Sequence, residues 1–336
     1  MKKVTIRDIA AATGTSIATV SRALQGKPGV SEELRERLKE VAARLNYVPR
    51  PTVKPGSIMM LVFPSHYLRE GSHVFGRGVE VLYDRAAEAK MLVMTQTDHD
   101  AEVEACKKIL KEQDVSVLIY FCGVPRDEIV EVATKQGTEV IVIHRQVDNP
   151  YISTFISDDY YGGQLVAEHF LATGRRKAIY LVPEDTKGRY SARERFAGFS
   201  DRMLQAGAEV QMVTMPKAPL EERIRYVQKQ GGDFNAVFAY SDLQAREFAE
   251  GAALVGLRIP EEVSLVGYNN SNHVGVTTPE LSSVYWPIDK LCHMVMDHVE
   301  RYVAGRYDVF PIQVSVRPRL IIRGSSDLSL CVSKTS

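Results

Sequence analysis

From Ile58 onward the chain alternates short apolar runs with longer amphipathic stretches of helical or loop pattern. This alternation is typical of parallel β-sheets covered by helices. Because roughly 270 residues reach the size at which a single hydrophobic core stops growing, we expect an α/β fold with two lobes, each a doubly wound parallel sheet. The expected strands span residues 58–63, 91–94, 115–120, 139–143, 178–182, 236–239 and 263–267.

The first fifty residues instead repeat their apolar positions at helical spacing. A helix of about two turns is expected over residues 4–13, with Thr5 as its N-cap. Gly14 permits a tight turn, and Ser16 can cap a second helix whose apolar residues face inward. A third helix over residues 31–45 closes a small core. Two short helices joined by a glycine turn predict a helix-turn-helix.

The outer face of the second helix has little bulk. It carries, at helical spacing, Ile17, Ala18, Ser21 and Arg22. Small side chains let a helix approach base edges in the DNA major groove, where an arginine bridges guanine atoms and an isoleucine or alanine contacts a thymine methyl group. Serine and threonine hydroxyls can reach phosphates. We therefore favour DNA binding over the alternative, a helical hairpin with a capped, alanine-rich surface.

Charge is divided unequally along the chain. The whole chain has 42 Lys and Arg against 42 Asp and Glu, a net charge of zero. Residues 1–57 hold 11 basic and 5 acidic side chains, which leaves 31 basic and 37 acidic in the remainder. A basic N-terminal module is typical of phosphate-backbone binding, although an ordinary solvated surface is the alternative that charge alone leaves open.

Motifs of several other protein classes do not occur in this sequence. No apolar run approaches the roughly eighteen residues that span a bilayer, and the N-terminus lacks the apolar core of a signal peptide. We therefore expect a cytoplasmic protein with no membrane partner, which counts against a periplasmic sugar carrier. No phosphate-binding loop, nucleophile elbow or zinc-protease motif occurs, so we expect no catalytic residues, no cofactor and no enzymatic activity.

The cysteines and histidines lack the spacing of metal ligands, and we expect no metal site. Four scattered cysteines, expected to be reduced and three of them packed as small apolar groups, are Cys106, Cys122, Cys292 and Cys331. A conceivable cluster that we interpret as solvated loop residues comprises His66, His73, His144, Asp98 and Asp100.

From Val4 to Pro49 the sequence resembles the head of the lactose-repressor (LacI) family of bacterial transcription regulators. The family motifs occur in order as "VTIRDIA", "SIATVSRAL", "VSEELRERL" and "LNYVP". The resemblance implies a homodimer on a palindromic double-stranded DNA operator, because a single head reads about half a site. It implies base contacts from Ile17, Ala18 and Arg22. It also implies phosphate contacts from Thr5, Ser16, Thr19, Ser21 and Ser31, to which we add Gln25 and Arg50 as DNA-contact candidates.

The segment after this head departs from the family. Pro49, Pro51 and Pro55 remove amide donors and favour extended backbone, so no helical turn is expected. The family's A-x-x-L hinge helix, whose leucine enters the minor groove, has no counterpart before Ile58. Arg50 contacts the groove or a phosphate, or else belongs to a plain spacer.

The body resembles the family more loosely, through stretches such as "ISDDYYGGQLVAEHF", "SARERFAGF" and "TTPELSSVYWP". The resemblance implies a core of the periplasmic-binding-protein type, with two lobes, three crossings and a small-molecule effector in the cleft. The expected divisions are a head over 1–49, a linker over 50–57, an amino lobe over 58–156 and 287–313, a carboxyl lobe over 157–286 and 314–325, and a polar tail over 326–336.

Several cleft residues follow from the resemblance. Arg195 matches the family's ligand arginine, with pairing to Glu194 or Asp201 at the surface as the alternative. Asp158 matches the interlobe aspartate, with helix capping as a competing role. Trp286 stacks on a ligand or packs at the hinge, and Phe75 is a weaker candidate for the cleft wall.

Two positions in the cleft depart from the family pattern. Where the family has N-D and then G-[FY]-D, this chain has Ser241-Asp242 and Tyr268-Asn269. An amide at 269 replaces a charge-assisted acceptor for a sugar hydroxyl. The resemblance implies a repressor of carbohydrate-related genes controlled by a sugar or sugar derivative, and the amide at 269 favours an unusual one, such as an anionic sugar. The alternative is a regulator whose core has lost sugar binding and senses a non-sugar ligand or none.

Overall fold

The structure, a computed structural model, describes residues 6–24, 29–45, 47, 58–64, 73–86, 90–96, 100–303 and 311–327. The linker over 50–57 and the end of the polar tail lie outside these ranges, so what the sequence predicts of them stays a prediction. Three of the expected DNA contacts, Thr5, Gln25 and Arg50, also lie outside the described residues. Within the described ranges, no helix is long and apolar enough to cross a bilayer.

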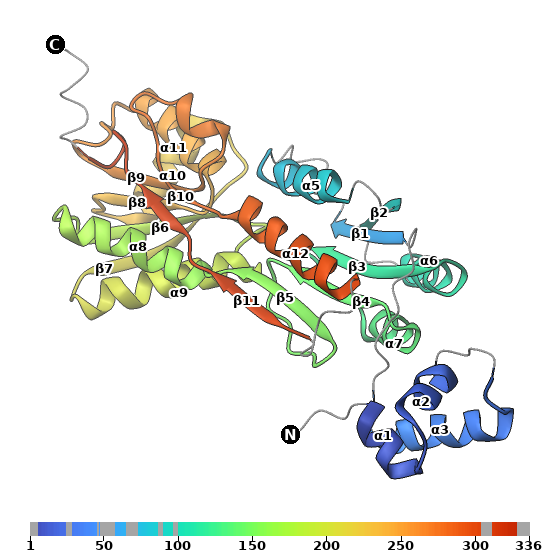
Figure 1. The fold of residues 1–336 in the computed structure, drawn as a ribbon. Coiled ribbons are helices and arrows are strands. Elements are labelled where there is room, and N and C mark those ends of the chain that lie inside the picture. The colour runs from blue at the N-terminus through green and yellow to red at the C-terminus, as the bar shows by residue number, and fades with distance from the viewer. Residues whose placement is uncertain are drawn as a thin grey trace.

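Three helices form the N-terminal head, as predicted (Figure 1). They are α1 (Ile6–Thr13), α2 (Ile17–Leu24) and α3 (Glu32–Arg44). Ile9, Val20 and Leu38, one from each helix, are fully buried where the three helices meet. The helical spacing of apolar residues therefore gives the small core that the sequence predicts.

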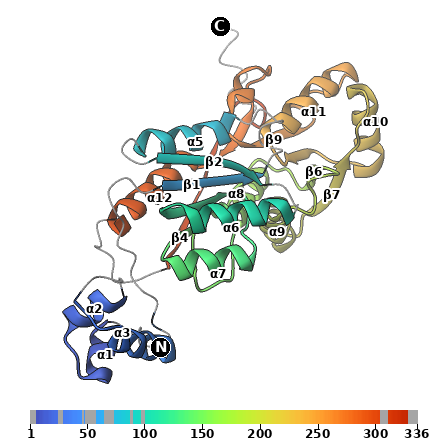
Figure 2. The same ribbon diagram turned by 90° about the vertical axis from the view of Figure 1, so that its right-hand side faces the viewer.

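The first sheet of the core has six parallel strands in the order β11-β5-β4-β3-β1-β2. The strands are β1 (Ile58–Pro64), β2 (Lys90–Gln96), β3 (Val115–Phe121), β4 (Glu139–Ile143), β5 (Ile152–Ser157) and β11 (Gln313–Val316). Two helices cover each face (Figures 1 and 2): α5 (His73–Arg85) with α12 (Ile288–Val303), and α6 (Asp100–Glu112) with α7 (Asp127–Gln136). The alternation along β1 produces these layers, since Leu61 packs in the cluster with α5 and α12 whereas Val62 packs in the cluster with α6 and α7.

The second sheet repeats this plan, in the order β12-β10-β9-β8-β6-β7. Its strands are β6 (Lys177–Pro183), β7 (Glu209–Met215), β8 (Ala236–Ala239), β9 (Ser264–Asn269), β10 (Ser282–Tyr285) and β12 (Arg319–Ile321), and only the β10–β12 pair is antiparallel. One face packs on α8 (Asp159–Ala172) and α9 (Tyr190–Gln205), the other on α10 (Leu220–Gly231) and α11 (Asp242–Leu254). The expected pair of doubly wound sheets is thus present.

The chain crosses between the two sheets after β5, after β10 and after β11 (Figure 1). The expected lobe boundary after residue 313 falls inside β11, which pairs with β5 as far as Val316. The first sheet therefore extends further along the chain than the sequence predicts, because a short strand of alternating exposure gives little apolar signal.

The seven expected strands are all present, but β5, β7, β10, β11 and β12 were not predicted from apolar runs. Polar residues interrupt these strands, as in "ISTFIS" and "SSVY". Ser282 and Ser283 of β10 are fully buried because their hydroxyls are hydrogen-bonded, to the Arg323 carbonyl at 3.0 Å and to the Asp242 carboxylate at 2.5 Å respectively. A buried strand can therefore have a polar sequence where its hydroxyls find acceptors.

Candidate functional site

The start of helix α2 has the geometry that the sequence predicts. Gly14 has a φ of +65°, which turns the chain between α1 and α2. The Ser16 hydroxyl accepts a hydrogen bond from the Thr19 amide at 3.0 Å, and the Ser16 and Thr19 hydroxyl oxygens lie 2.8 Å apart. Both polar side chains therefore sit at the N-terminus of α2, where helix dipole and free amides favour a phosphate.

Helix α2 has one buried face and one exposed face. Val20 and Ala23 are buried in the head core, whereas Ile17 is 45% exposed. Ala18 and Arg22 are exposed on the same side as Ile17. The structure thus brings the three expected base-contact residues together on one surface. Ser21 belongs to α2, but its side chain lies outside the description.

Ser31 lies at the start of helix α3 and is exposed. Its hydroxyl accepts a hydrogen bond from the Leu34 amide at 3.4 Å, a longer cap than that of α2. Ser31 is therefore the N-cap of α3. A phosphate contact from this hydroxyl stays a prediction.

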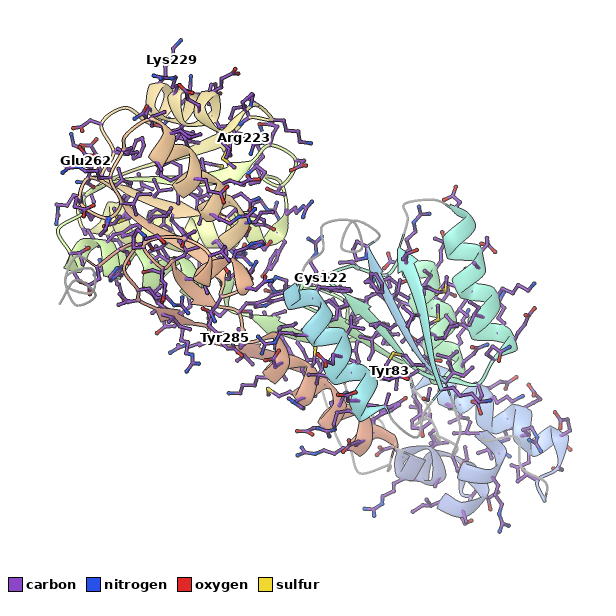
Figure 3. All side chains as sticks on the ribbon, turned by 90° about the horizontal axis from the view of Figure 1, so that it is seen from above. Tyr83, Cys122, Arg223, Lys229, Glu262 and Tyr285 are labelled. Carbon is purple, nitrogen blue, oxygen red and sulfur yellow. The ribbon has the colours of Figure 1, made fainter. Side chains whose placement is uncertain are left out.

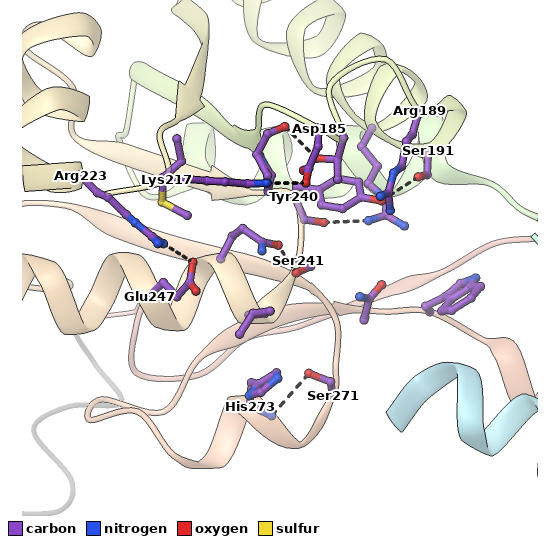
Figure 4. A pocket seen from close by; sticks show the side chains of 18 of the residues that line it. Asp185, Arg189, Ser191, Lys217, Arg223, Tyr240, Ser241, Glu247, Ser271 and His273 are labelled. Carbon is purple, nitrogen blue, oxygen red and sulfur yellow. Dashed lines mark hydrogen bonds and ion pairs between the residues drawn. The ribbon is translucent and has the colours of Figure 1, made fainter. Parts of the chain in front are cut away.

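A cavity of about 360 Å³ opens at the carboxyl ends of the strands of the second sheet (Figure 4). Its lining includes Pro183 at the end of β6, Met215 at the end of β7, Tyr240 after β8 and Asn269 at the end of β9. His144 after β4 and Trp286 after β10 complete it from the side of the first sheet. This is the edge at which parallel α/β sheets bind ligands, because the loops and helix N-termini converge there.

Arg195 lines the cavity and is 3% exposed. Its Nε donates to Asp159 Oδ1 at 3.3 Å and its Nη1 donates to the Tyr240 carbonyl at 2.8 Å. The guanidinium carbon lies 3.5 Å from the centroid of the Tyr268 ring. Burial lowers the pKa of Arg195, but the Asp159 carboxylate and the neighbouring tyrosines raise it above its ordinary value, so the group stays charged. The alternative pairing at the surface is wrong, because Arg195 is buried and Asp201 accepts from the Tyr160 hydroxyl instead.

The buried partner of this arginine is Asp159, which the sequence analysis did not select. Asp159 is 2% exposed, and its Oδ1 also accepts from the Tyr268 hydroxyl at 2.8 Å. Asp158, the expected cleft aspartate, caps α8 by accepting from the Tyr161 amide at 2.9 Å and lies outside the cavity lining. The competing role named for Asp158 is thus the one seen. The sequence signal for Asp159 was the pair Asp158-Asp159, in which the first residue caps α8 and the second is buried in the core.

His144 is a second residue that sequence reasoning misplaced. It is 7% exposed, not a solvated loop residue, and has a φ of +63° just beyond β4. Its Nε2 lies 3.6 Å from Asp159 Oδ2, and its ring centroid lies 4.4 Å from that of Trp286. Burial lowers the pKa of His144 to about 4, although the Asp159 carboxylate opposes this shift. His144 is therefore neutral near pH 7 and contacts a residue of α8, across the boundary between the sheets.

Trp286, Ser241 and Asn269 line the cavity, as expected for ligand contacts. Trp286 is 5% exposed, and its Nε1 has no hydrogen-bond partner among the described residues. The Ser241 hydroxyl donates to Gln244 Oε1 at the start of α11. Asn269 has a φ of +102°, which asparagine tolerates better than most side chains.

Two other expected effector contacts, Asp242 and Phe75, lie outside the lining of the cavity. Asp242 is fully buried and accepts from the Ser271 amide at 2.6 Å, the Ser271 hydroxyl at 3.0 Å and the Ser283 hydroxyl. Burial raises the pKa of Asp242 to about 7, against the effect of these hydrogen bonds. Phe75 packs in the core of the first sheet, with ring centroids 4.7 Å from Phe63 and 4.8 Å from Phe121. Phe75 is therefore a core residue of the first sheet, and Asp242 anchors the loop at Ser271.

Charged side chains also line the cavity (Figure 4). Arg223 pairs with Glu247 at 2.9 Å, and Lys217 lies 3.4 Å from Asp185. Arg189 and Ser191 come from the start of α9. None of these residues was selected from the sequence, because they come from loops and from three different helices, α9, α10 and α11, without a common motif.

The described residues contain no group of three or more His, Cys, Asp or Glu side chains that could hold a metal ion. Three of the cysteines are buried free thiols, as predicted: Cys106, Cys122 and Cys292. Cys331 lies outside the described residues.

Two protein-family models match the chain. Residues 5–50 match the model for bacterial regulatory proteins of the lacI family, and residues 167–326 match the model for a periplasmic binding protein-like domain. The first match covers the head, and the second covers all six strands of the second sheet together with α12 and β11 of the first.

Curated relatives share both parts of the chain. The HTH-type transcriptional regulator DegA of Bacillus subtilis is 25% identical over 308 residues, which cover 86% of this chain and 88% of DegA. Catabolite control protein A of Staphylococcus xylosus is 24% identical over 330 residues, which cover 96% of this chain and 99% of that protein.

Solved structures of similar fold include a complex of the transcriptional regulator CelR with cellobiose, with a TM-score of 0.68 and 21% identity over 96% of this chain and all of that one. The lac repressor dimer bound to operator and the anti-inducer ONPF has a TM-score of 0.65 and 21% identity, with 97% of this chain and 99% of that one covered.

Proposed function

Because the chain belongs to the lacI family of bacterial regulatory proteins, which are transcription regulators and not enzymes, we propose that it represses carbohydrate-related genes. In this proposal a homodimer binds a palindromic operator, and a sugar or sugar derivative in the cavity changes its affinity for DNA. Similar folds have been solved with cellobiose, D-xylulofuranose and ribose bound, which supports a sugar-like ligand here.

The observation that carries the DNA-binding part is the exposed face of α2. Ile17, Ala18 and Arg22 lie together on this face, and the buried face of the same helix packs on α1 and α3. No described residue of the head competes for Arg22, which makes no hydrogen bond or ion pair to any of them. Such a surface suits the major groove, where the arginine can hold guanine and the isoleucine can contact thymine.

The buried polar groups of the cavity support the effector part. Arg195, His144 and Trp286 are each under 10% exposed, yet each lines the cavity. Arg195 forms hydrogen bonds to Asp159 and Tyr240 through Nε and Nη1 and makes none to a described residue through Nη2, so Nη2 can donate to a ligand in the cavity. Because His144 and Trp286 belong to the side of the first sheet and Arg195 to α9, a ligand that contacts all three links the two sheets.

The test starts with selection of bound duplexes from a random DNA pool by the full-length protein. The proposal predicts an enriched palindrome and two chains per selected duplex in sedimentation analysis. Absence of enrichment, one chain per duplex, or a tetramer in light scattering would contradict it. Turnover of any sugar or nucleotide by the purified protein would contradict it as well.

A further inference from the structure

We propose that His144 and Asp159 form a latch between the two lobes of the core, closed while the His144 ring is neutral and released when that ring takes up a proton. The first lobe is the first sheet with its helices, and the second lobe is the second sheet with its helices. The inference goes beyond the proposed function, because the latch acts in the protein alone, without operator or effector.

The latch lies where the chain crosses between the lobes. His144 follows β4 of the first sheet, and Asp159 is the first residue of α8, directly after the crossing that leaves β5. Trp286, whose ring centroid lies 4.4 Å from that of His144, follows β10 at the second crossing. Tyr285, the residue before it, lies at the junction of the two lobes (Figure 3). A movement of one lobe against the other therefore acts directly on the contact between His144 and Asp159.

This contact is close but incompletely bonded. His144 is 7% exposed and Asp159 is 2% exposed, and 3.6 Å separates His144 Nε2 from Asp159 Oδ2, which is longer than a hydrogen bond. Asp159 Oδ2 and His144 Nδ1 are both buried without a hydrogen-bond partner among the described residues. Buried polar atoms without partners carry a desolvation cost that contact with water removes. Parting of the lobes would hydrate both atoms, so this contact is released more readily than a fully bonded one.

Each side of the latch is anchored in its own lobe. Asp159 Oδ1 accepts from Arg195 and from the Tyr268 hydroxyl, which both belong to the second lobe. The His144 amide donates to the Phe155 carbonyl of the first sheet at 2.7 Å. The φ of His144 is +63°, a conformation that a histidine keeps where the surrounding structure imposes it. Each group therefore stays with its own lobe when the lobes part.

The charges around His144 decide whether the closed latch tolerates a proton. Among the described residues, the charged groups that act on His144 are Asp159 of α8, Arg195 of α9 and Arg145, next in the same loop. Burial lowers the pKa of His144 to about 4, Arg195 and Arg145 add to this shift, and Asp159 opposes it. Because Asp159 already pairs with Arg195, a protonated His144 would place a second buried cation against one carboxylate.

Proton uptake therefore favours the open lobes. In the open arrangement the His144 ring is exposed and regains its ordinary pKa of 6.5. The closed arrangement binds fewer protons, so its advantage is complete above pH 6.5 and is lost as the pH falls toward 4. Relative to its value above pH 7.5, the ratio of open to closed protein should rise about tenfold by pH 5.5 and about thirtyfold by pH 5.

The single tryptophan is a reporter at the latch in the full-length protein. Trp286 is 5% exposed and packs on His144, so parting of the lobes exposes it to water. Tryptophan emission and small-angle X-ray scattering are recorded from pH 8 to pH 5, with far-UV circular dichroism and sedimentation velocity on the same samples. We expect a longer emission wavelength and a larger radius of gyration as the pH falls, at constant helix content and oligomeric state.

Substitutions of His144 separate the latch from other titrating groups. His144→Gln and His144→Phe cannot take up a proton, so both should keep the emission wavelength and radius of gyration of pH 8 down to pH 5. His144→Phe also keeps an aromatic ring against Trp286, which guards against a packing defect in His144→Gln. His293→Gln is the matched control, because His293 is exposed on α12, and this variant should respond as the wild type does.

Four outcomes would overturn the proposal. The first is a wild type whose emission wavelength and radius of gyration stay constant from pH 8 to pH 5. The second is a fall in emission intensity alone, which would mean that His144 takes up its proton within closed lobes. The third is a response of both His144 variants equal to that of the wild type. The fourth is a parallel loss of helix or of subunits, which would mean unfolding or dissociation instead of a released latch.

Discussion

The head and the cavity both place recognition chemistry near the start of a helix, but at opposite extremes of burial. On α2, Ile17 is 45% exposed and the cationic Arg22 is exposed beside it, whereas in the cavity Arg195 is 3% exposed. An exposed cation stays hydrated until DNA arrives, whereas a buried cation has to be compensated inside the protein. Substitutions on the exposed face of α2 should therefore change DNA binding alone, whereas substitutions around Arg195 should change stability as well.

The largest expected effect is a loss of stability when Asp159, the partner of the buried Arg195, loses its charge. Asp159→Asn leaves the charge of Arg195 buried without compensation, so the free energy of unfolding of the core should fall by about 3–5 kcal/mol. Urea unfolding followed by the fluorescence of Trp286, the single tryptophan, measures it. Asp201→Asn, which removes an exposed carboxylate, is the control and should cost less than about 1 kcal/mol. Equal losses of unfolding free energy in Asp159→Asn and Asp201→Asn would contradict the contrast between buried and exposed charges.

The next effect is a pH dependence of the free energy of unfolding, which arises from the buried His144. Burial lowers the pKa of His144 to about 4 from an ordinary 6.5, so the folded state binds fewer protons than the unfolded state between these values. Stability from this group is present above pH 6.5 and is lost as the pH falls toward 4, by up to about 3 kcal/mol.

The His144→Gln variant isolates that contribution. The wild type should lose stability relative to His144→Gln as urea unfolding is repeated from pH 7 down to pH 4.5. His293→Gln, an exposed histidine on α12, should track the wild type over the same range. A constant difference between wild type and His144→Gln across this range would show that His144 is not a buried neutral group.

On the exposed side of the comparison, Arg22→Ala should weaken binding to the selected operator by about 1–3 kcal/mol, that is, roughly tenfold to a hundredfold. Its free energy of unfolding should stay within about 0.5 kcal/mol of the wild type, because Arg22 is exposed and has no partner among the described residues. Fluorescence anisotropy with labelled duplex gives the affinity. Arg22→Lys separates base contact from charge, since it keeps the charge and loses the bidentate fork.

The smallest effect concerns the caps of the head. Ser16→Ala removes the 3.0 Å cap of α2 and should destabilise the head by about 1 kcal/mol. Ser31→Ala removes the longer 3.4 Å cap of α3 and should cost less. Circular dichroism of the full chain during heating detects early loss of head helix. A larger loss in Ser31→Ala would reverse the ranking of the two caps.

How much of each site the sequence predicts depends on how far apart its residues lie along the chain. The surface of α2 was predictable because its residues lie within six positions on one helix, so helical periodicity alone brings Ile17 and Arg22 together. The α/β plan was predictable because the seven expected strands are largely apolar runs, such as "IMMLVF" in β1.

The cavity was less predictable because its residues come from separate helices and loops. Asp158 and Asp159 are neighbours, and only the packing of α8 decides which of them caps the helix and which is buried beside Arg195. Arg189 has no motif to mark it, and its place follows from where α9 begins. Strand β10 escaped prediction because its serines are buried through hydrogen bonds that only the tertiary structure provides.

The central claim is that the exposed face of α2 reads the operator, and a paired selection tests it most directly. Full-length wild type, Ile17→Ala and Arg22→Ala are each used to select duplexes from the same random pool, and the bound DNA is sequenced. The account predicts that each variant relaxes base preference at its own position, symmetrically in both half-sites, with the rest of the palindrome unchanged. Identical preferences for all three proteins would contradict it.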